Sequence, residues 1–405
     1  MARPTIGYSS NAWMCRKMTL MQFGFPDARL TGQLVRSEFA ASVLAITKRF
    51  GKQMVLIRGK SLLLGCLLVG HGGIVEAGER QKSLRLAVWG GSHAAMLEHA
   101  VLAPFEATTD IRLQAKPRLD VDLDMKSNSA DVVELELHEA IDACDNGELA
   151  LLPGAEIGDF VPNAMQPCAL GQYVWSTVFA YDQRAFKSSD QPSLVSDFFN
   201  VGHYPGGRAV HRSPRVISEW ALLAAGIPGA DVYDALNEPD LAWQIIERAL
   251  ESIKHSIVWV DDDDQAIDLL RGGTVSFAMV GSDTLLRAVL AGANDLNPVW
   301  DGSVNQMSLW AIPANSAHPE LAWQFLRYAT SVDATRRFSS VSGYGPARFS
   351  SIEQMRTAYH RYLPSDRSNL GNVVWGNSGW WRGRGRSLDM HFGNWLSAQS
   401  VKSDS

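Results

Sequence analysis

Residues 83–93, which read Ser-Leu-Arg-Leu-Ala-Val-Trp-Gly-Gly-Ser-His, decide the fold of this 405-residue chain. Apolar side chains alternate with others over 84–88, which is typical of a short strand. Trp89 ends this strand, a Gly-Gly turn follows, and Ser92 is placed to cap a helix that extends to about Ala107. A strand, a glycine turn and a capped helix point free backbone N–H groups at whatever lies above the turn.

This turn has two interpretations. In the first, Trp89, Gly90, Gly91 and Ser92 bind a ligand, with the indole as a large flat apolar surface. In the second, Trp89 belongs to the core and the glycines only make a tight turn. The stretch alone favours neither.

Composition narrows the class of protein. The chain is long enough for two domains, and 46% apolar with 20% charged residues is typical of a soluble globular protein. The formal net charge is −6 and no long basic block is present, which argues against a nucleic-acid partner. No G-x-S-x-G, Walker loop or H-E-x-x-H occurs, so we expect neither an enzyme nor a cofactor.

The opening turn also carries a resemblance. Trp-Gly-Gly at 89–91 after a first strand, followed by Ala-Pro-Phe-Glu-Ala-Thr-Thr-Asp-Ile at 103–111, resembles the start of a bacterial extracellular solute-binding protein. The subgroup is the spermidine/putrescine type, which feeds ABC importers. The similarity covers roughly 83–397 and includes Val-Trp-Ser-Thr at 174–177 and Tyr-Gly-Pro at 344–346.

The resemblance implies an α/β fold of the two-domain periplasmic-binding-protein type (type II), with three hinge crossings near residues 181, 304 and 346. The first lobe would comprise 83–180 with 305–345. The second would comprise 181–304 with 346–395, and 396–405 would be a tail.

The N-terminal residues predict export. Residues 54–77 combine basic residues, a short apolar run and a small-x-small exit, which is typical of a secretory signal peptide. A lipoprotein-like box around Cys66 is the alternative, with an unusually short apolar region. Residues 1–53 match no part of the family, so we interpret them as a non-native or disordered extension. The mature chain would then be periplasmic.

After signal cleavage, Cys144 and Cys168 are the remaining cysteines. An oxidising compartment and an even count favour a disulfide, with two buried thiols as the alternative. The resemblance adds weight to the bond. No C-x-x-C pair occurs, and the acidic run 261–264 is explained by a helix start, so we expect no metal.

Three acids are candidate ligand contacts. Glu134 and Glu136 fall at the exit of a predicted strand over 131–136, where open α/β sheets bind ligands. Asp283 follows another predicted strand, over 272–280. For each acid the alternative is an ordinary structural role, as a solvated loop acid or a helix cap.

Further candidates come from the resemblance, which places them along the cleft. They lie on the two predicted crossing strands and at the third crossing: Trp175, Ser176, Thr177, Gln306, Ser308, Trp310 and Tyr344. Aromatic faces hold cations with about 0.5–2 kcal/mol each. Two expected carboxylates are missing, however, since their positions are held by Arg215 or Val216 and by Ser308.

These features together predict a periplasmic binding component of an ABC importer, which captures a small organic solute in an interdomain cleft and delivers it to a membrane permease. A polyamine-like amine is favoured, and we expect a monomer. One alternative is a secreted enzyme on a bilobal scaffold, which would need a perturbed acid–base pair in the cleft. The other is an orphan binder or chemoreceptor partner for a non-amine solute, which would have no neighbouring permease gene.

Overall fold

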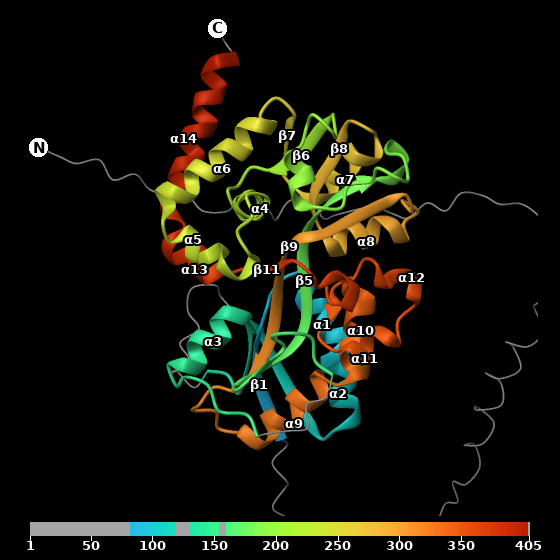
Figure 1. Cartoon of the computed structure of the whole chain (residues 1–405). Helices are drawn as coiled ribbons and strands as arrows, with labels where there is room; N and C mark the ends of the chain where they lie inside the picture. The colour runs from blue at the N-terminus through green and yellow to red at the C-terminus, as the bar shows by residue number, and fades with distance from the viewer. Residues whose placement is uncertain (1–81, 119–128, 154–158, 404–405) are drawn as a thin grey trace, which may run out of the picture. The chain divides into compact units, whose positions relative to one another are not determined.

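The computed structural model describes residues 82–118, 129–153 and 159–403 (Figure 1). The predicted extension (1–53) and signal peptide (54–77) lie outside the described residues. Among the described residues, no helix is both long and apolar enough to cross a membrane.

One twisted mixed sheet organises the chain, with strand order β2-β1-β3-β9-β5-β8-β6-β7. β1 is parallel to β2 and β3, and β6 is parallel to β7 and β8, whereas β3, β9, β5 and β8 pair in antiparallel fashion. The strands are β1 (Lys82–Val88), β2 (Ile111–Pro117), β3 (Val132–Glu136), β5 (Ala169–Asp182), β6 (Gly207–His211), β7 (Ile257–Val260), β8 (Val275–Gly281) and β9 (Leu296–Ala311). Three short strands pair alongside β5 or β9: β4 (Met165–Gln166), β10 (Gly345–Pro346) and β11 (Val373–Trp375).

Two of these strands belong to both halves of the sheet. β5 has 14 residues and β9 has 16, and they pair along most of their length. The β9 end at residues 308–311 pairs with β3, while the β5 end at residues 177–181 pairs with β8. Figure 1 shows both strands passing from one group of helices to the other. We call the part with β1, β2 and β3 the first half and the part with β6, β7 and β8 the second half.

Helices cover both faces of the sheet. The predicted helix after Trp89 is present as α1 (Ser92–Leu97), a π-helical segment (Glu98–Leu102) and α2 (Ala103–Thr108). The first half also carries α3 (Leu137–Asp145), α9 (Pro319–Ala329), α10 (Val332–Ser342) and α11 (Phe349–Glu353). The second half carries α4 (Ile217–Ala224), α5 (Val232–Leu236), α6 (Pro239–Ile253), α7 (Asp263–Arg271), α8 (Ser282–Leu290), α13 (Ser378–Arg384) and α14 (Arg386–Ser403), and α12 spans Thr357–His360.

The buried side chains form three clusters. One lies between the first half of the sheet and α1, α2, α9 and α10, and a second lies between the second half and α4, α6 and α14. The third follows the opposite face of the sheet through both halves, under α3, α7 and α8. The long strands β5 and β9 therefore contribute alternate residues to all three clusters, which fixes their register. The lobe boundaries given above stay a prediction.

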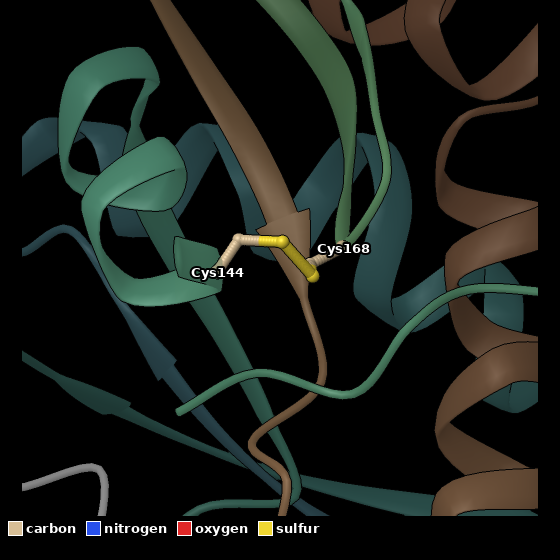
Figure 2. Close-up of a disulfide and its surroundings, with 2 residues drawn as sticks. All are labelled: Cys144 and Cys168. Atoms are coloured by element: carbon tan, nitrogen blue, oxygen red, sulfur yellow. A yellow bond between two sulfur atoms is a disulfide. The ribbon is translucent and has the colours of Figure 1, made fainter. Parts of the chain in front are cut away.

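A disulfide joins Cys144, in the last turn of α3, to Cys168, directly before β5 (Figure 2). The Cα atoms are 5.8 Å apart, and the two cysteines are 24 positions apart in the sequence. Of the two alternatives that the sequence left open, the structure has the disulfide. The bond closes the loop between α3 and the strand that leads into the second half.

We expect the double variant Cys144→Ser/Cys168→Ser to lose about 3 kcal/mol of unfolding free energy, because an unfolded chain without the cross-link gains loop entropy. Urea denaturation of the variant and of the oxidised and reduced wild type measures this. Reduced wild type should match the variant. Equal stability of all three samples would show that the bond contributes nothing.

Candidate ligand-binding site

The candidate residues lie mainly where the parallel strands end. β1 and β3 of the first half end at Val88 and Glu136, and β6 and β8 of the second half end at His211 and Gly281. Ligands of open α/β sheets bind outside these carboxyl ends. The two long strands β5 and β9 connect the two sets of ends.

Glu134 is the centre of the first-half side. Its carboxylate is fully buried and accepts hydrogen bonds from the Trp89 backbone N–H (3.0 Å), the Tyr173 hydroxyl (3.1 Å) and the Ser308 hydroxyl (2.9 Å). The His93 Nε2 atom lies 3.1 Å from the same carboxylate. Burial and the neighbouring carboxylate raise the pKa of Tyr173 well above its usual value, so the phenol stays a donor.

This arrangement corrects two expectations. Glu134 and Ser308 were predicted as ligand contacts, but both are fully buried and bonded to each other. These protein donors satisfy the hydrogen-bonding capacity of the carboxylate. Glu134 therefore holds the surrounding elements in place and does not offer its charge to a solute.

Three aromatic rings, those of Tyr173, Trp175 and Tyr344, pack together beside Glu134, and we call them the aromatic wall. The Tyr173 ring stacks on Tyr344 with 5.0 Å between centroids and 17° between planes. Trp175 lies 5.7 Å from Tyr173 and 6.2 Å from Tyr344. Trp175 and Tyr344 are half-buried, so part of each ring is accessible. Burial, followed by the nearby Asp283 carboxylate, raises the pKa of Tyr344 to about 12.

Asp283 approaches this wall from the second half. It lies in the first turn of α8, its side chain is 18% exposed, and its Oδ2 atom pairs with Arg287 at 2.6 Å. A Cβ added at Gly343, the residue before Tyr344, would lie 3.4 Å from the Asp283 Cα and Cβ atoms. Burial and the nearby Asp263 charge raise the pKa of Asp283, despite the opposing effect of Arg287.

Asp263 and His211 lie next to Asp283. His211 Nε2 is 2.9 Å from Asp263 Oδ1, and the Gly281 N–H donates to Asp263 Oδ2 at 2.8 Å. A Cβ at Gly281 would come within 2.8 Å of a carboxylate oxygen of Asp263 and of Asp283. Only glycine leaves room for both carboxylates there.

The predicted turn after β1 differs in detail from the expectation. Gly91, with φ of 69°, is the residue before α1, and Ser92 is the first helical residue without a capping hydrogen bond. The expected Ser92 cap is therefore wrong, because a glycine takes that position. Gly90, Gly91 and Ser92 are exposed.

Trp89 already carries a cation from the protein. The Arg118 guanidinium lies 4.1 Å from the indole centroid, donates to the Glu134 carbonyl at 2.7 Å and pairs with Glu139. One face of the Trp89 ring is thus covered by the Arg118 guanidinium. The ring is half-buried and packed against Arg118, and the ligand contact of Trp89 stays a prediction.

Glu136 lies where the two halves touch. It is half-buried, closes a capping box with Glu139 at the start of α3 and is hydrogen-bonded to Ser378 of α13. Burial is the main reason that its pKa is raised. His138 bonds the Trp375 backbone, and burial lowers the pKa of its imidazole.

The remaining candidates divide between the site and the core. Trp175 is paired with Gln306 across β5 and β9, and Thr177 is paired with Gly281 across β5 and β8. Ser176 is buried and donates to the Val304 carbonyl. Trp310 is also fully buried, so it cannot meet a solute; the expectation of a stacking contact from it is corrected. Phe325 packs on its ring edge-on at 5.2 Å.

Several site residues were not predicted, because their roles depend on partners far away in sequence. In the sequence they are a histidine in a helix start, an arginine after a strand, a tyrosine within a strand, a histidine at a strand end and an acid in an acidic run. They are His93, Arg118, Tyr173, His211 and Asp263. Within 82–118, 129–153 and 159–403, no group of three potential metal-ligating side chains is present.

Comparison with known proteins places the chain in a family. The family described as "Bacterial extracellular solute-binding protein" matches residues 100–360. The chain belongs to this family. It is 28% identical over 339 residues to the gamma-aminobutyric acid-binding protein of Pseudomonas aeruginosa, a match that covers 82% of this chain and 95% of that protein.

Solved structures support the same fold. The Atu4243–GABA receptor superposes with a TM-score of 0.61 at 21% identity, covering 78% of this chain and 97% of that one. The spermidine/putrescine substrate-binding protein PotD of Streptococcus pneumoniae gives 0.61 at 14% identity, covering 77% and 98%. The predicted two-domain type II periplasmic-binding-protein fold is therefore confirmed. The family is also confirmed, but not the spermidine/putrescine type.

Membership has direct consequences for function. Proteins of this family are solute-binding components of ABC transporters, which work with a membrane permease, and they are binding proteins and not enzymes. The family is extracellular, which in bacteria implies the periplasm.

The Asp263–His211 contact predicts a pH-dependent stability. Burial raises the pKa of Asp263, but the hydrogen bonds from His211 and the Gly281 N–H oppose this effect. The net result is a pKa below its usual value. The folded state thus binds this proton less tightly than the unfolded state. The resulting stabilisation is present above the unfolded pKa of about 3.9 and disappears as pH falls through the folded pKa.

We therefore expect Asp263→Asn to lose more unfolding free energy at pH 7 than at pH 3, measured by urea denaturation. Asp264→Asn is the matched control, because Asp264 is exposed one residue further along the same helix. A loss that is equal at both pH values would contradict the stabilising role of the Asp263 charge.

Proposed function

We propose that this chain is the binding component of an ABC importer for a small solute with one ammonium group and one carboxylate, and that 4-aminobutyrate (GABA) is the first candidate. The solute would bind between the two halves, where hinge closure would trap it. The names of two similar proteins, the gamma-aminobutyric acid-binding protein and the Atu4243–GABA receptor, support this choice.

The observation that carries the proposal is the corner formed by Asp283, Tyr344 and Trp175. Asp283 supplies a negative charge in a partly buried place, and Tyr344 and Trp175 supply aromatic faces. Trp175 reaches this corner because it lies two residues before Thr177, which is paired with Gly281. A carboxylate beside aromatic rings suits an ammonium group, since both attract a cation.

A polyamine fits less well than the sequence alone indicated. Two ammonium groups need two available carboxylates, yet Glu134 is enclosed by its own donors and Asp263 is held by His211 and Gly281. Asp283 is also paired, but its partner Arg287 is 54% exposed and can move aside. Of Glu134, Asp263 and Asp283, only Asp283 can thus be freed for an ammonium group, which favours a solute that carries one such group.

Isothermal titration of the purified chain with 4-aminobutyrate, putrescine, glucose and succinate tests the proposal. Unfolding and refolding beforehand removes co-purified solute. We expect saturable binding of 4-aminobutyrate that is tighter than binding of the other three. Tighter binding of putrescine would favour the polyamine, and tighter binding of glucose or succinate would contradict an ammonium-bearing solute.

The variant Asp283→Asn tests the corner itself. Removal of one charge-assisted contact costs about 1.5–3 kcal/mol, so we expect binding of 4-aminobutyrate to weaken about 10- to 100-fold. Arg287→Gln is the matched control, because it removes the partner of Asp283 and keeps the carboxylate. Its affinity should be unchanged or higher. Unchanged affinity in Asp283→Asn would contradict the assignment.

A further inference from the structure

We propose that His138 of α3 holds the two halves together around the bound solute and releases them when the surroundings become acidic. The inference rests on the proposed function only in that the halves close on a solute, whichever solute that is. His138 is a positioning residue, because it acts through residues of the second half and not on the solute itself.

The first turn of α3 meets three elements that belong to the second half or lead into it. His138 is hydrogen-bonded to the Trp375 backbone in β11, and its ring lies 6.5 Å from the Tyr233 ring of α5. Glu136, two residues earlier, is hydrogen-bonded to Ser378 of α13. We call these three interactions the closing contact.

The closing contact and the Asp283 corner lie on either side of the two long strands. In Figure 1, α3 and α13 lie to the left of β5 and β9, and α8 and α10 lie to the right. Asp283 is in the first turn of α8, and Gly343, close to it, directly follows α10. The halves therefore touch on both sides of the proposed solute position, and a change in either contact alters how firmly they close.

The hydrogen bond to Trp375 shows which nitrogen of the imidazole carries the proton. The Nε2 atom of His138 is buried and has no hydrogen-bond partner among the described residues, so the Nδ1 atom makes the bond. This bond by itself raises the pKa of the imidazole, which means that the ring donates and the Trp375 carbonyl accepts. A neutral ring with its proton on Nδ1 thus makes the closing contact.

A second proton on His138 would have no acceptor. It would bind to Nε2 and place a charged group where no hydrogen-bond partner replaces water. Burial is the largest effect on this imidazole, and it lowers the pKa below its usual value. His138 is also the second residue of α3, where the helix dipole opposes a positive charge. The closed form therefore favours the neutral ring.

The neighbouring charges do not reverse this preference. Asp142, one helical turn further along α3, raises the pKa of His138, but by less than burial lowers it. The carboxylate of Glu139 is paired with an arginine, and that of Glu219 accepts from a tyrosine hydroxyl. The titratable and charged groups that act on the closing contact are Arg118, Glu136, Glu139, Asp142, Glu219, Tyr233 and Arg382.

The direction of the pH dependence follows from the two forms of the chain. In the open form the imidazole meets water, and its pKa returns to the usual value of about 6.5. In the closed form the pKa is lower, so the closed form binds this proton less tightly. Closure is thus strongest above about pH 6.5 and weakens as the pH falls from there towards the closed-form pKa. By linkage, a bound solute in turn lowers the pKa of His138.

The test measures the dissociation constant of 4-aminobutyrate at pH 7.5 and pH 5.5 by isothermal titration, in the wild type and in His138→Asn. The Asn side chain can donate from the position of Nδ1 but does not titrate. In the wild type we expect the constant to rise several-fold on acidification, up to the limit of about tenfold that an open-form pKa of about 6.5 sets. In His138→Asn we expect a smaller rise, because the other groups titrate in both chains.

His203→Asn is the matched control, because His203 is an exposed histidine that pairs with Asp190 outside the closing contact. Its ratio of the two constants should equal that of the wild type. His138→Ala removes the donor as well as the charge, so it should bind more weakly than His138→Asn already at pH 7.5. Thermal unfolding checks that each variant is folded.

NMR titration of the His138 imidazole gives a second readout that requires no particular solute. We expect a pKa below the usual value of about 6.5 in the chain without added solute, because the ring is buried at the closing contact. We expect a still lower pKa once a solute is bound. The resonance is assigned by its absence in His138→Asn.

The outcomes separate this inference from the proposed function. Binding of putrescine, glucose or succinate in place of 4-aminobutyrate overturns the proposed solute, and the pH comparison is then made with the solute that binds. Equal pH ratios in the wild type and His138→Asn overturn the inference and leave the proposed function in place. If none of the four solutes binds, the proposed function fails, and a His138 pKa at or above its usual value overturns the inference as well.

Discussion

The site depends on one buried carboxylate. Glu134 is fully enclosed and is bonded by the Trp89 backbone, Tyr173, Ser308 and His93, although among the described residues no arginine or lysine forms an ion pair with its carboxylate. A buried charge is tolerated only when enough donors replace water. Because these donors come from the turn after β1, from α1, from β5 and from β9, the charge fixes four elements relative to one another.

Tyr173 connects Glu134 to the residues that are proposed to contact the solute. Its hydroxyl is held by Glu134, and its ring stacks on Tyr344, which lies next to Asp283 of the second half. The hydrogen bonds of Glu134 thus lie in the first half, and Asp283, which is proposed to meet the ammonium group, lies in the second. This arrangement suits a binding protein whose two halves close about the long strands β5 and β9. One half can stay preformed while the other supplies a charged contact.

The sequence predicted the fold better than the site, for a physical reason. Alternation over 84–88 and the dense β-branched run in β5 reflect burial within each strand, so periodicity detects them. Periodicity does not tell which strand positions a distant helix covers, and so Glu134, Ser308 and Trp310 were all taken as accessible. Ser92 failed as a cap for a local reason, since the glycine before it adopts a conformation that ends the turn one residue earlier.

The residues that the sequence did not reveal are those whose function comes from a partner. Arg118 became recognisable only when it lay over Trp89, and His93 only when it lay beside Glu134, 41 positions away. By contrast, Arg215 was visible in the sequence as a departure from the polyamine pattern. The structure adds that it lies directly before α4, with its guanidinium 5.7 Å from the centroid of the Trp381 ring.

A crystal structure of the chain with 4-aminobutyrate tests the account most directly. We expect the ammonium group at Asp283 and Tyr344, and unchanged hydrogen bonds from Tyr173 and Ser308 to Glu134. A solute whose ammonium group is bonded to Glu134, with Tyr173 or Ser308 displaced, would contradict the claim that this carboxylate builds the site without touching the solute.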